Sequence, residues 1–129
     1  MRLLLDTQVA LWWLTAHPRL SRASRALIGR SDCSVSVASL WEVAIKHQVG
    51  KLAVPPERFR DELRRGGASL LFVSDEHVIS SAGIAAPHGD PFDRLLLAVA
   101  ETEQLMLLTA DTALLALAET APSLPIREA

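Results

Sequence analysis

The chain has 129 residues, 50% of them hydrophobic, and a formal net charge of −2 at pH 7. This length suits one domain with a sizeable core, so we expect residues 1–129 to form a single domain. The charge excludes a bulk attraction to nucleic acid, so any RNA or DNA site needs local positive charge. Cys33 is the only cysteine and the four histidines are scattered, which excludes an internal disulfide and the usual zinc-site spacings.

The first segment, MRLLLDTQVALWWL, is apolar, but Asp6 interrupts it too early for a secretory leader. No apolar run elsewhere in the sequence approaches the length of a membrane span. We therefore expect a soluble, cytoplasmic protein that has no membrane partner.

Short apolar runs along the chain predict buried strands. They lie at residues 2–5, 33–37, 69–73, 105–109 and, near the C-terminus, 124–127. Between these runs, apolar residues recur at the spacing of helices. The clearest helical segments are residues 20–29, 39–50 and 55–67. The alternation predicts an α/β fold with a central parallel sheet of four to five strands and helices on both faces.

Four acidic residues fall near the ends of these strands. Asp6 directly follows the first predicted strand, and Asp111 follows the fourth after one intervening residue. Glu42 lies in the first turn of the helix after the second strand, and Asp93 in the first turn of the helix before the fourth. Ligands of parallel sheets bind at the carboxyl ends of the strands, so Asp6, Glu42 and Asp111 are expected at one edge. Asp93 joins them if its helix begins near that edge.

Each of these acids also has an ordinary structural explanation. Asp6 and Asp111 fit as N-caps of the helices that follow them. Glu42 stands three residues after Ser39, as in a capping box, and four before Lys46, as in a helical ion pair. Capping explains single acids at helix starts, but not their convergence on one edge of a sheet. Clustered carboxylates repel one another, and a set of oxygen ligands suits a hard cation such as Mg²⁺ or Mn²⁺.

The stretch HGDPFDRLLLAVA contains two acids that are three residues apart. As a helix start, it makes Asp90 the N-cap, puts Pro91 at N1, where the missing N–H is harmless, and puts Asp93 at N3. Asp90 is then bonded to the backbone. Asp93 either completes the cap or points toward a metal ion.

The sequence resembles a known family in four blocks that follow one another along the chain. The blocks are LLLDTQVALWWL, VSVASLWEVAIKHQVGKL, HGDPFDRLLLAVA and LLTADTALL. Together they are similar to PIN-domain ribonucleases, and in particular to the VapC-type toxins of bacterial toxin–antitoxin pairs. The resemblance covers nearly the whole chain. It implies a three-layer α/β/α sandwich, Mg²⁺- or Mn²⁺-dependent cleavage of RNA, inhibition by a cognate antitoxin protein, and a homodimer.

By this resemblance, four acids match the metal-binding acids of the family: Asp6, Glu42, Asp93 and Asp111. The resemblance implies that Asp6, Asp93 and Asp111 bind the ion, while Glu42 is a ligand or orients the attacking water. Thr109 matches the small hydroxyl residue that often precedes the last acid, which makes it a candidate substrate-binding residue.

Several further positions bear on the substrate. Lys46 and Arg94 are candidates for contacts with backbone phosphates. Gln8 stands where close relatives often carry His, which is a departure from the pattern of the family. Trp12 and Trp13 are adjacent, so they face different directions on a helix, and we expect one in the core and the other available to a partner.

Two other functions are compatible with this pattern. A phospho-acceptor receiver domain, which is a signalling module, has this size and an acidic metal-binding edge, and Asp75 after the third predicted strand favours it. However, the chain has only Asp6 after the first strand and no lysine at the end of the fifth. A catalytically silent binding module of the PIN fold is the other alternative, and the presence of all four acids argues against it.

Overall fold

The computed structural model describes residues 1–84 and 90–129. Within them the chain forms five strands and seven helices in alternation. The strands are β1 (Arg2–Leu5), β2 (Asp32–Ser36), β3 (Ser69–Leu71), β4 (Met106–Thr109) and β5 (Ile126–Glu128). The helices are α1 (Thr7–Leu14), α2 (Arg22–Gly29), α3 (Val37–Gln48), α4 (Pro56–Arg65), α5 (Asp75–Ala82), α6 (Pro91–Glu103) and α7 (Thr112–Thr120).

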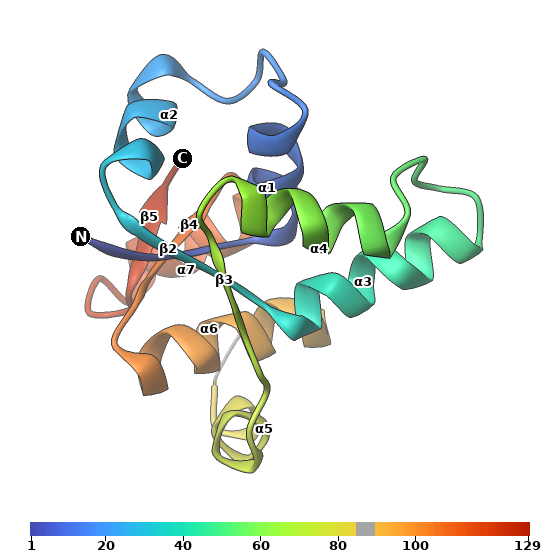
Figure 1. The fold of residues 1–129 in the computed structure, drawn as a ribbon. Helices are drawn as coiled ribbons and strands as arrows, with labels where there is room; N and C mark the ends of the chain where they lie inside the picture. The colour runs from blue at the N-terminus through green and yellow to red at the C-terminus, as the bar shows by residue number, and fades with distance from the viewer. Residues whose placement is uncertain (85–89) are drawn as a thin grey trace.

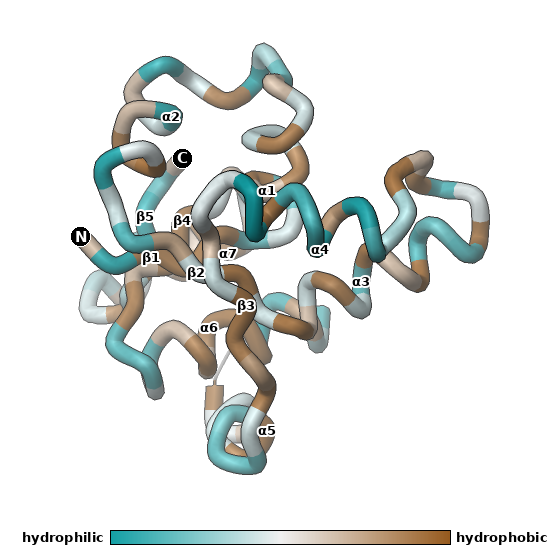
Figure 2. The backbone as a smooth tube through the Cα atoms, in the orientation of Figure 1, coloured by the Kyte–Doolittle hydropathy of each residue, from teal (hydrophilic) through white to brown (hydrophobic). Residues whose placement is uncertain are grey.

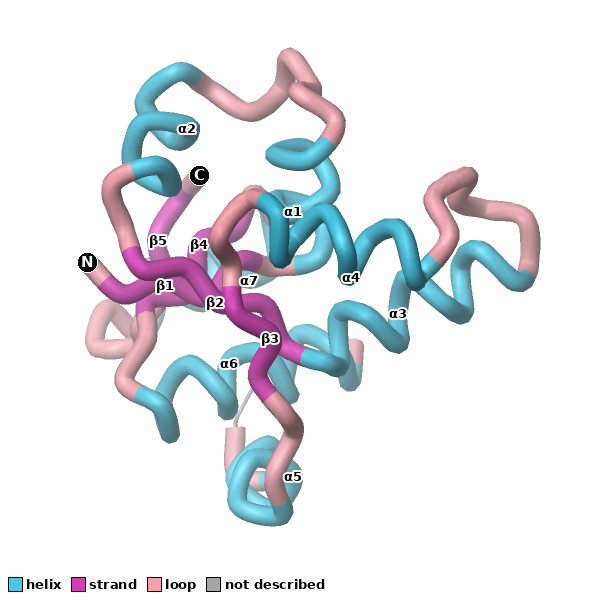
Figure 3. The backbone as a smooth tube through the Cα atoms, in the orientation of Figure 1, coloured by secondary structure: helices cyan, strands magenta, loops and turns pink. Residues whose placement is uncertain are grey.

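The five strands form one sheet at the centre of the molecule, in the order β3-β2-β1-β4-β5 (Figures 1 and 3). Every neighbouring pair is parallel, and in the central strand Leu4 pairs with both Ser34 of β2 and Leu107 of β4. The predicted parallel sheet is therefore confirmed. The chain moves outward from β1 to β3 on one side and then returns to place β4 on the other side of β1. The carboxyl ends of β1 and β4 thus meet where the winding reverses.

Apolar side chains alternate between the two faces of the sheet, and each face is covered by helices. Leu3 and Leu5 pack with residues from α1 to α4, including Val9, Phe59 and Leu63. On the other face, neighbouring strand residues pack against α6 and α7. Figure 1 shows α1, α2 and α4 on one side of the sheet and α5 and α6 on the other. In Figure 2, hydrophobic residues follow β3 and much of α6, whereas the edge strand β5 is largely hydrophilic. The predicted three-layer α/β/α arrangement is confirmed.

The boundaries of the second strand and its following helix differ from the prediction. The strand ends at Ser36, whose side chain accepts the backbone N–H of Ala38 at 3.0 Å and caps α3. The helix consequently begins at Val37 rather than at residue 39. The predicted capping box of Ser39 with Glu42 is therefore wrong, because Ser39 lies inside the helix, where its Oγ accepts a hydrogen bond from Thr7 at 2.9 Å.

The other boundaries lie closer to the prediction, with one omission. Ser21 caps α2 as expected, since its side chain accepts the N–H of Ser24 at 3.1 Å. The third strand ends at Leu71, two residues earlier than predicted. The helix α5 that follows was not predicted from the sequence. No helix among the residues described is long and apolar enough to cross a membrane.

The sheet order also decides between the alternatives. A receiver-type doubly wound sheet has the order 2-1-3-4-5, in which the first strand lies between the second and the third. Here β1 lies between β2 and β4. Asp75, the residue that favoured a receiver, opens α5 and accepts the N–H of Glu76 at 3.0 Å. The receiver alternative is therefore excluded.

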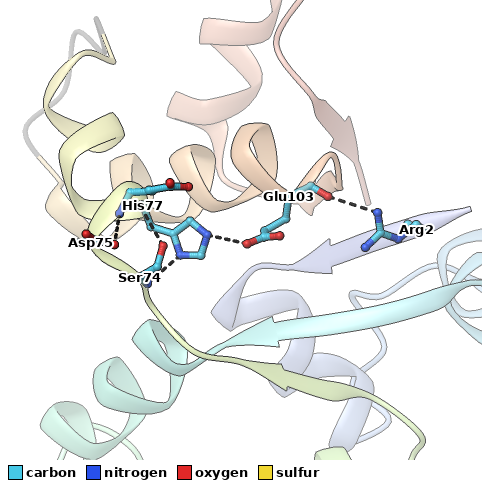
Figure 4. Close-up of polar contacts among 6 residues, drawn as sticks. Arg2, Ser74, Asp75, His77 and Glu103 are labelled. Carbon is cyan, nitrogen blue, oxygen red and sulfur yellow. Dashed lines mark hydrogen bonds and ion pairs between the residues drawn. The ribbon is translucent and has the colours of Figure 1, made fainter.

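A buried histidine fixes α5 to the C-terminal end of α6 (Figure 4). The side chain of His77 is 2% exposed, and its Nδ1 accepts the backbone N–H of Ser74 at 3.0 Å. Because Nδ1 is an acceptor, the ring proton is assigned to Nε2, which donates to the carboxylate of Glu103 at 2.9 Å. Arg2 in turn donates to the backbone carbonyl of Glu103 at 3.2 Å.

Candidate functional site

A pocket of about 260 Å³ opens at the carboxyl edge of the sheet, beside the ends of β1 and β4. All four predicted acids line it, so Asp93 does join the other three. The lining residues are Asp6, Thr7, Gln8, Leu11, Trp12, Glu42, Lys46, Asp90, Asp93, Leu96, Ala110 and Asp111. The pocket collects residues from α1, α3, α6 and the loop after β4.

Asp6 is the most deeply buried acid of the pocket. It caps α1, since Oδ1 accepts the N–H of Val9 at 2.7 Å, and Oδ2 accepts the hydroxyl proton of Thr109. The pKa of this carboxyl is raised from 3.8 to about 6, mainly by burial. The two hydrogen bonds lower the pKa, and the charges of Asp111 and Glu42 raise it slightly. Asp6 therefore caps α1, but its two hydrogen bonds do not offset the effect of burial on its ionised form.

Thr109 joins the two acids that follow β1 and β4. Its hydroxyl donates to Asp6 and accepts the backbone N–H of Asp111 at 3.0 Å. Asp111 caps α7, since its Oδ1 accepts the N–H groups of Ala113 and Leu114 at 2.9 and 3.0 Å. Thr109 is completely buried and is not one of the residues that line the pocket. Its contacts are those of a positioning residue rather than of a substrate-binding residue.

The start of α6 has the predicted arrangement. Asp90 is the N-cap and accepts the N–H of Phe92 at 2.9 Å, Pro91 follows at N1, and Asp93 stands in the first turn. Because α6 runs antiparallel to the strands, this first turn lies at the carboxyl edge of the sheet, where both acids line the pocket.

Asp93 has the most strongly perturbed carboxyl group of the pocket. Its pKa is raised to about 7, first by burial and then by the charges of neighbouring acids. In decreasing order, these acids are Asp90, Asp111, Asp6 and Glu42. A carboxyl group with this pKa is partly protonated at neutral pH, because the pocket does not supply enough positive charge to hold it ionised.

Lys46 is the cation that lines this pocket. Its Nζ lies 2.9 Å from Oε2 of Glu42, one turn earlier on α3. The predicted ion pair is thus confirmed, although Glu42 lies in the second turn of the helix and not in the first. The side chain of Glu42 is 17% exposed and that of Lys46 48%, so the ammonium covers the carboxylate from the solvent side.

Arg94, the other predicted phosphate contact, does not line the pocket. Its Nε is buried and has no hydrogen-bond partner within residues 1–84 and 90–129. Trp12 does line the pocket, together with Gln8, because the cap at Asp6 starts α1 so that residues 8 and 12 lie on the helix face next to the acids. The sequence left open which of the two tryptophans has this position.

The donor set of the pocket fits a hard divalent cation. The pocket offers carboxylate oxygens, which Mg²⁺ and Mn²⁺ prefer. Burial and, to a smaller extent, the charges of neighbouring acids raise the pKa values of Asp6 and Asp93, so a cation in the pocket would favour their ionised forms. In the described part of the chain, no three His, Cys, Asp or Glu side chains are close enough to hold an ion as they stand. Oδ2 of Asp111 is an oxygen of the pocket that no capping hydrogen bond uses.

Comparisons with known proteins agree with the fold. The family described as PIN domain matches residues 3–120 of this chain. Ribonuclease VapC16 of Mycobacterium tuberculosis (strain ATCC 25618 / H37Rv) is 36% identical over 81 residues, which cover 55% of this chain and 57% of that protein. The aligned part is thus little more than half the length of that relative.

Three solved structures share the fold over almost all of both chains. VapBC2 from Rickettsia felis bound to a DNA fragment from its promoter has a TM-score of 0.70 at 15% identity and covers 99% of this chain and 98% of that one. DNA-bound VapBC from Salmonella typhimurium has a TM-score of 0.70 at 18% identity and covers 99% of this chain and 98% of that one. A toxin–antitoxin complex from Klebsiella pneumoniae has a TM-score of 0.64 at 19% identity and covers 97% of this chain and 95% of that one. At these identities the likeness concerns the fold.

Proposed function

Because this chain belongs to the PIN-domain family, we propose that it is a divalent-metal-dependent endoribonuclease formed by a single domain over residues 1–129. The observation that carries the proposal is the pocket where Asp6, Glu42, Asp93 and Asp111 gather at the carboxyl edge of the sheet. Such a pocket repels a phosphodiester when it is empty of cations and attracts one when it is loaded. The 36% identity to a ribonuclease supports RNA as the substrate.

In this proposal Asp6, Asp93 and Asp111 hold Mg²⁺ or Mn²⁺. When bound, the cation supplies an activated water and neutralises charge on the phosphate oxygens. Thr109 keeps the carboxylates of Asp6 and Asp111 in place through its two hydrogen bonds. Glu42 is a further ligand or accepts the proton of the attacking water.

Lys46 has a second task in the proposed reaction. Without a cation in the pocket, its ammonium neutralises Glu42 at 2.9 Å. Half of the lysine side chain is exposed, so it is able to turn from Glu42 to a phosphate oxygen of the substrate. Lys46 therefore replaces Arg94 as the phosphate contact that the pocket supports best.

The test is a cleavage assay with purified protein free of any partner. A structured RNA should be cut in the presence of Mg²⁺ or Mn²⁺, and cleavage should stop in excess EDTA. Undiminished cleavage in EDTA would contradict the metal mechanism. Retained RNA binding without cleavage in either metal would instead favour the catalytically silent binding module.

We further propose that the protein is the toxin of a toxin–antitoxin pair in the cytoplasm, since a ribonuclease active there must be restrained. Structural likeness to three toxin–antitoxin complexes supports this role. Expression of the chain alone should arrest growth. Co-expression with the adjacent small open reading frame should restore growth and yield a complex that co-purifies. Harmless expression with no co-purifying protein would contradict the role.

We propose a homodimer as the oligomeric state. Trp41, Ile45 and Val49 are 62%, 37% and 61% exposed. Their spacing of four puts them on one stripe that runs along α3 to its C-cap, Val49. An apolar stripe of this kind suits association with a second copy of the chain. Light scattering of the purified protein should give twice the monomer mass, and Trp41→Lys should shift it toward the monomer.

A further inference from the structure

The two adjacent tryptophans of α1 have different surroundings. Trp13 packs against the turn after α4, where a Cβ added to Gly66 would lie only 2.7 Å from Cη2 of the indole. Trp13 therefore packs against the core and the end of α4. Trp12 is half-buried against the core and also lines the acidic pocket. An aromatic surface thus borders the place where the phosphodiester is proposed to bind.

Two side chains of the connection between α1 and α2, which lies at the top of Figure 1, pack against the indole of Trp12. They are His17 and Arg19. The ring of His17 stacks on Trp12 with a centroid distance of 5.6 Å and an interplanar angle of 22°. The guanidinium of Arg19 lies 5.9 Å from the indole centroid, within the range of a cation–π contact. The backbone N–H of Arg19 also donates to Nδ1 of His17 at 3.1 Å, which ties the two residues together.

Arg25 fixes this arrangement from α2. Its Nη2 donates to the backbone carbonyl of His17 at 2.7 Å and lies 3.4 Å from that of Trp12. The aromatic pair is therefore supported by backbone contacts on both of its residues. A stacking surface that is already ordered loses little conformational entropy when a planar ligand binds to it.

The same segment has an unusual charge. Residues 7–31 contain four arginines and no acidic residue. None of these arginines forms an ion pair with an acid anywhere in residues 1–84 and 90–129. In contrast, α4 also contains four arginines, and two of them are paired with acids, Arg58 with Glu62 and Arg60 with Asp61. Of the four arginines in residues 7–31, Arg19 and Arg25 contact Trp12, so part of the local positive charge that a chain of net charge −2 needs for nucleic acid lies next to this indole.

We infer that Trp12, His17 and Arg19 form a subsite for an unpaired nucleotide next to the scissile phosphodiester. The inference rests on the proposed function, because it assumes that a nucleic-acid phosphate occupies the acidic pocket. The base stacks on the Trp12–His17 pair, and Arg19 binds the adjoining phosphate. A cation–π contact uses the flat face of the guanidinium, so its N–H groups in the plane stay available to the phosphate. A base inside a duplex is not accessible for such stacking, so the subsite selects single-stranded RNA.

The experiment measures binding of a labelled single-stranded RNA of about ten nucleotides by fluorescence anisotropy. The buffer contains Ca²⁺, a hard cation that loads the carboxylates of the pocket, and the RNA carries a backbone analogue that resists hydrolysis. Trp12→Leu should weaken binding about tenfold, whereas Trp12→Phe keeps a stacking ring and most of the affinity. Arg19→Gln should weaken binding about threefold and reduce the slope of log affinity against log salt by about 1. Arg30→Gln, which removes the same charge at the C-cap of α2, is the matched control and should change affinity less than twofold.

The outcomes separate this inference from the proposed function. If Trp12→Leu and Arg19→Gln bind RNA as the wild type does, the subsite is wrong, whether or not RNA is cleaved in Mn²⁺. If they lose RNA binding but the wild type never cleaves, the subsite stands and the nuclease proposal fails. If RNA affinity is unchanged but co-purification with a protein partner is lost, the surface is a protein contact and the inference is overturned. Since Arg19 is exposed, its variant keeps the test valid even if Trp12→Leu is destabilised.

Discussion

The two ends of α6 carry acids in opposite circumstances. At its C-terminal end, the carboxylate of Glu103 accepts a hydrogen bond from buried His77, and the backbone carbonyl of the same residue accepts one from Arg2 (Figure 4). At its N-terminal end, burial and, after it, the charges of neighbouring acids raise the pKa of Asp93 to about 7. The first cluster is completed by the chain itself. The second holds like charges together at a loss of stability, which is typical of a site built for a ligand that the chain does not contain.

The largest expected effect comes from replacing Asp93, the acid in the first turn of α6. Asp93→Asn should reduce RNA cleavage on the order of a hundredfold or more, because an amide is a poorer ligand for a hard cation. Without metal, the variant should melt at the same temperature as the wild type or higher, since one repelling charge is gone. It should also lose the rise in melting temperature on addition of Mn²⁺. An active variant with a normal Mn²⁺ response would show that Asp93 only caps its helix.

Variants at the C-terminal end of α6, where His77 contacts Glu103, should lose stability but retain activity. His77→Ala removes a buried ring and leaves the N–H of Ser74 without its acceptor, so it should lower the free energy of unfolding by about 2–3 kcal/mol. His77→Gln retains an acceptor for the capping box but not the contact with Glu103, and should lose about 1 kcal/mol. Denaturant titration measures both. Cleavage and the Mn²⁺ response of either variant should stay within about twofold of the wild type; a lost Mn²⁺ response would mean that the two ends are coupled.

The pH dependence of stability gives a third contrast. The pKa values of Asp6 and Asp93 are raised from 3.8 to about 6 and about 7. Their protonation therefore stabilises the metal-free fold fully below about pH 4, and this stabilisation is lost as pH rises through 6 to 7. In EDTA, the melting temperature should be higher at pH 5 than at pH 8. The difference should shrink in Asp93→Asn, whereas Mn²⁺ should stabilise the wild type more at pH 8 than at pH 5. An equal pH difference in both proteins would assign the effect to other groups.

The smallest effect concerns the acid that precedes Asp93. Asp90→Asn should retain stability and most of the cleavage activity, because Asn caps a helix about as well as Asp. Asp90→Ala should lose about 1 kcal/mol through loss of the bond to the N–H of Phe92. Thermal melting and the RNA assay of the two variants check this assignment. Activity in Asp93→Asn together with inactivity in Asp90→Asn would reverse the roles of the two acids.

Most of the fold was predictable because its determinants are local. The apolar run at residues 2–5 is β1 without change, and the helix start at Asp90 and Pro91 has the predicted register. The start of α3 was not predictable, since Ser36 and Ser39 are both able to cap a helix. The choice depends on Thr7, which bonds Ser39 from 32 residues away in the sequence. The helix α5 was missed although its start has a local signal, since Ser74 caps it and two acids stand in its first turn. Only its position against α6 depends on the contact of His77 with Glu103, 26 residues further on.

The candidate site divides in the same way. The position of Asp6 and Asp111 at the same edge of the sheet follows from the order of strands in the sequence, because each acid comes just after a parallel strand. The role of Thr109 could not be predicted, because its contact with Asp6 spans 103 residues. Similarly, the unpaired arginines of residues 7–31 were visible in the sequence, but only the stacking of Trp12 with His17 and Arg19 indicates what they surround.

The long span of the Asp6 contacts bears on how the protein folds. The backbone N–H of Asp6 bonds the carbonyl of Leu108 at 3.1 Å, and its carboxylate bonds Thr109, which lies 103 residues further along the chain. Contacts between residues so far apart in sequence form slowly, because a long loop has to close first. The acidic pocket therefore assembles only when β1 pairs with β4, and a folding intermediate without this pairing lacks the acidic cluster.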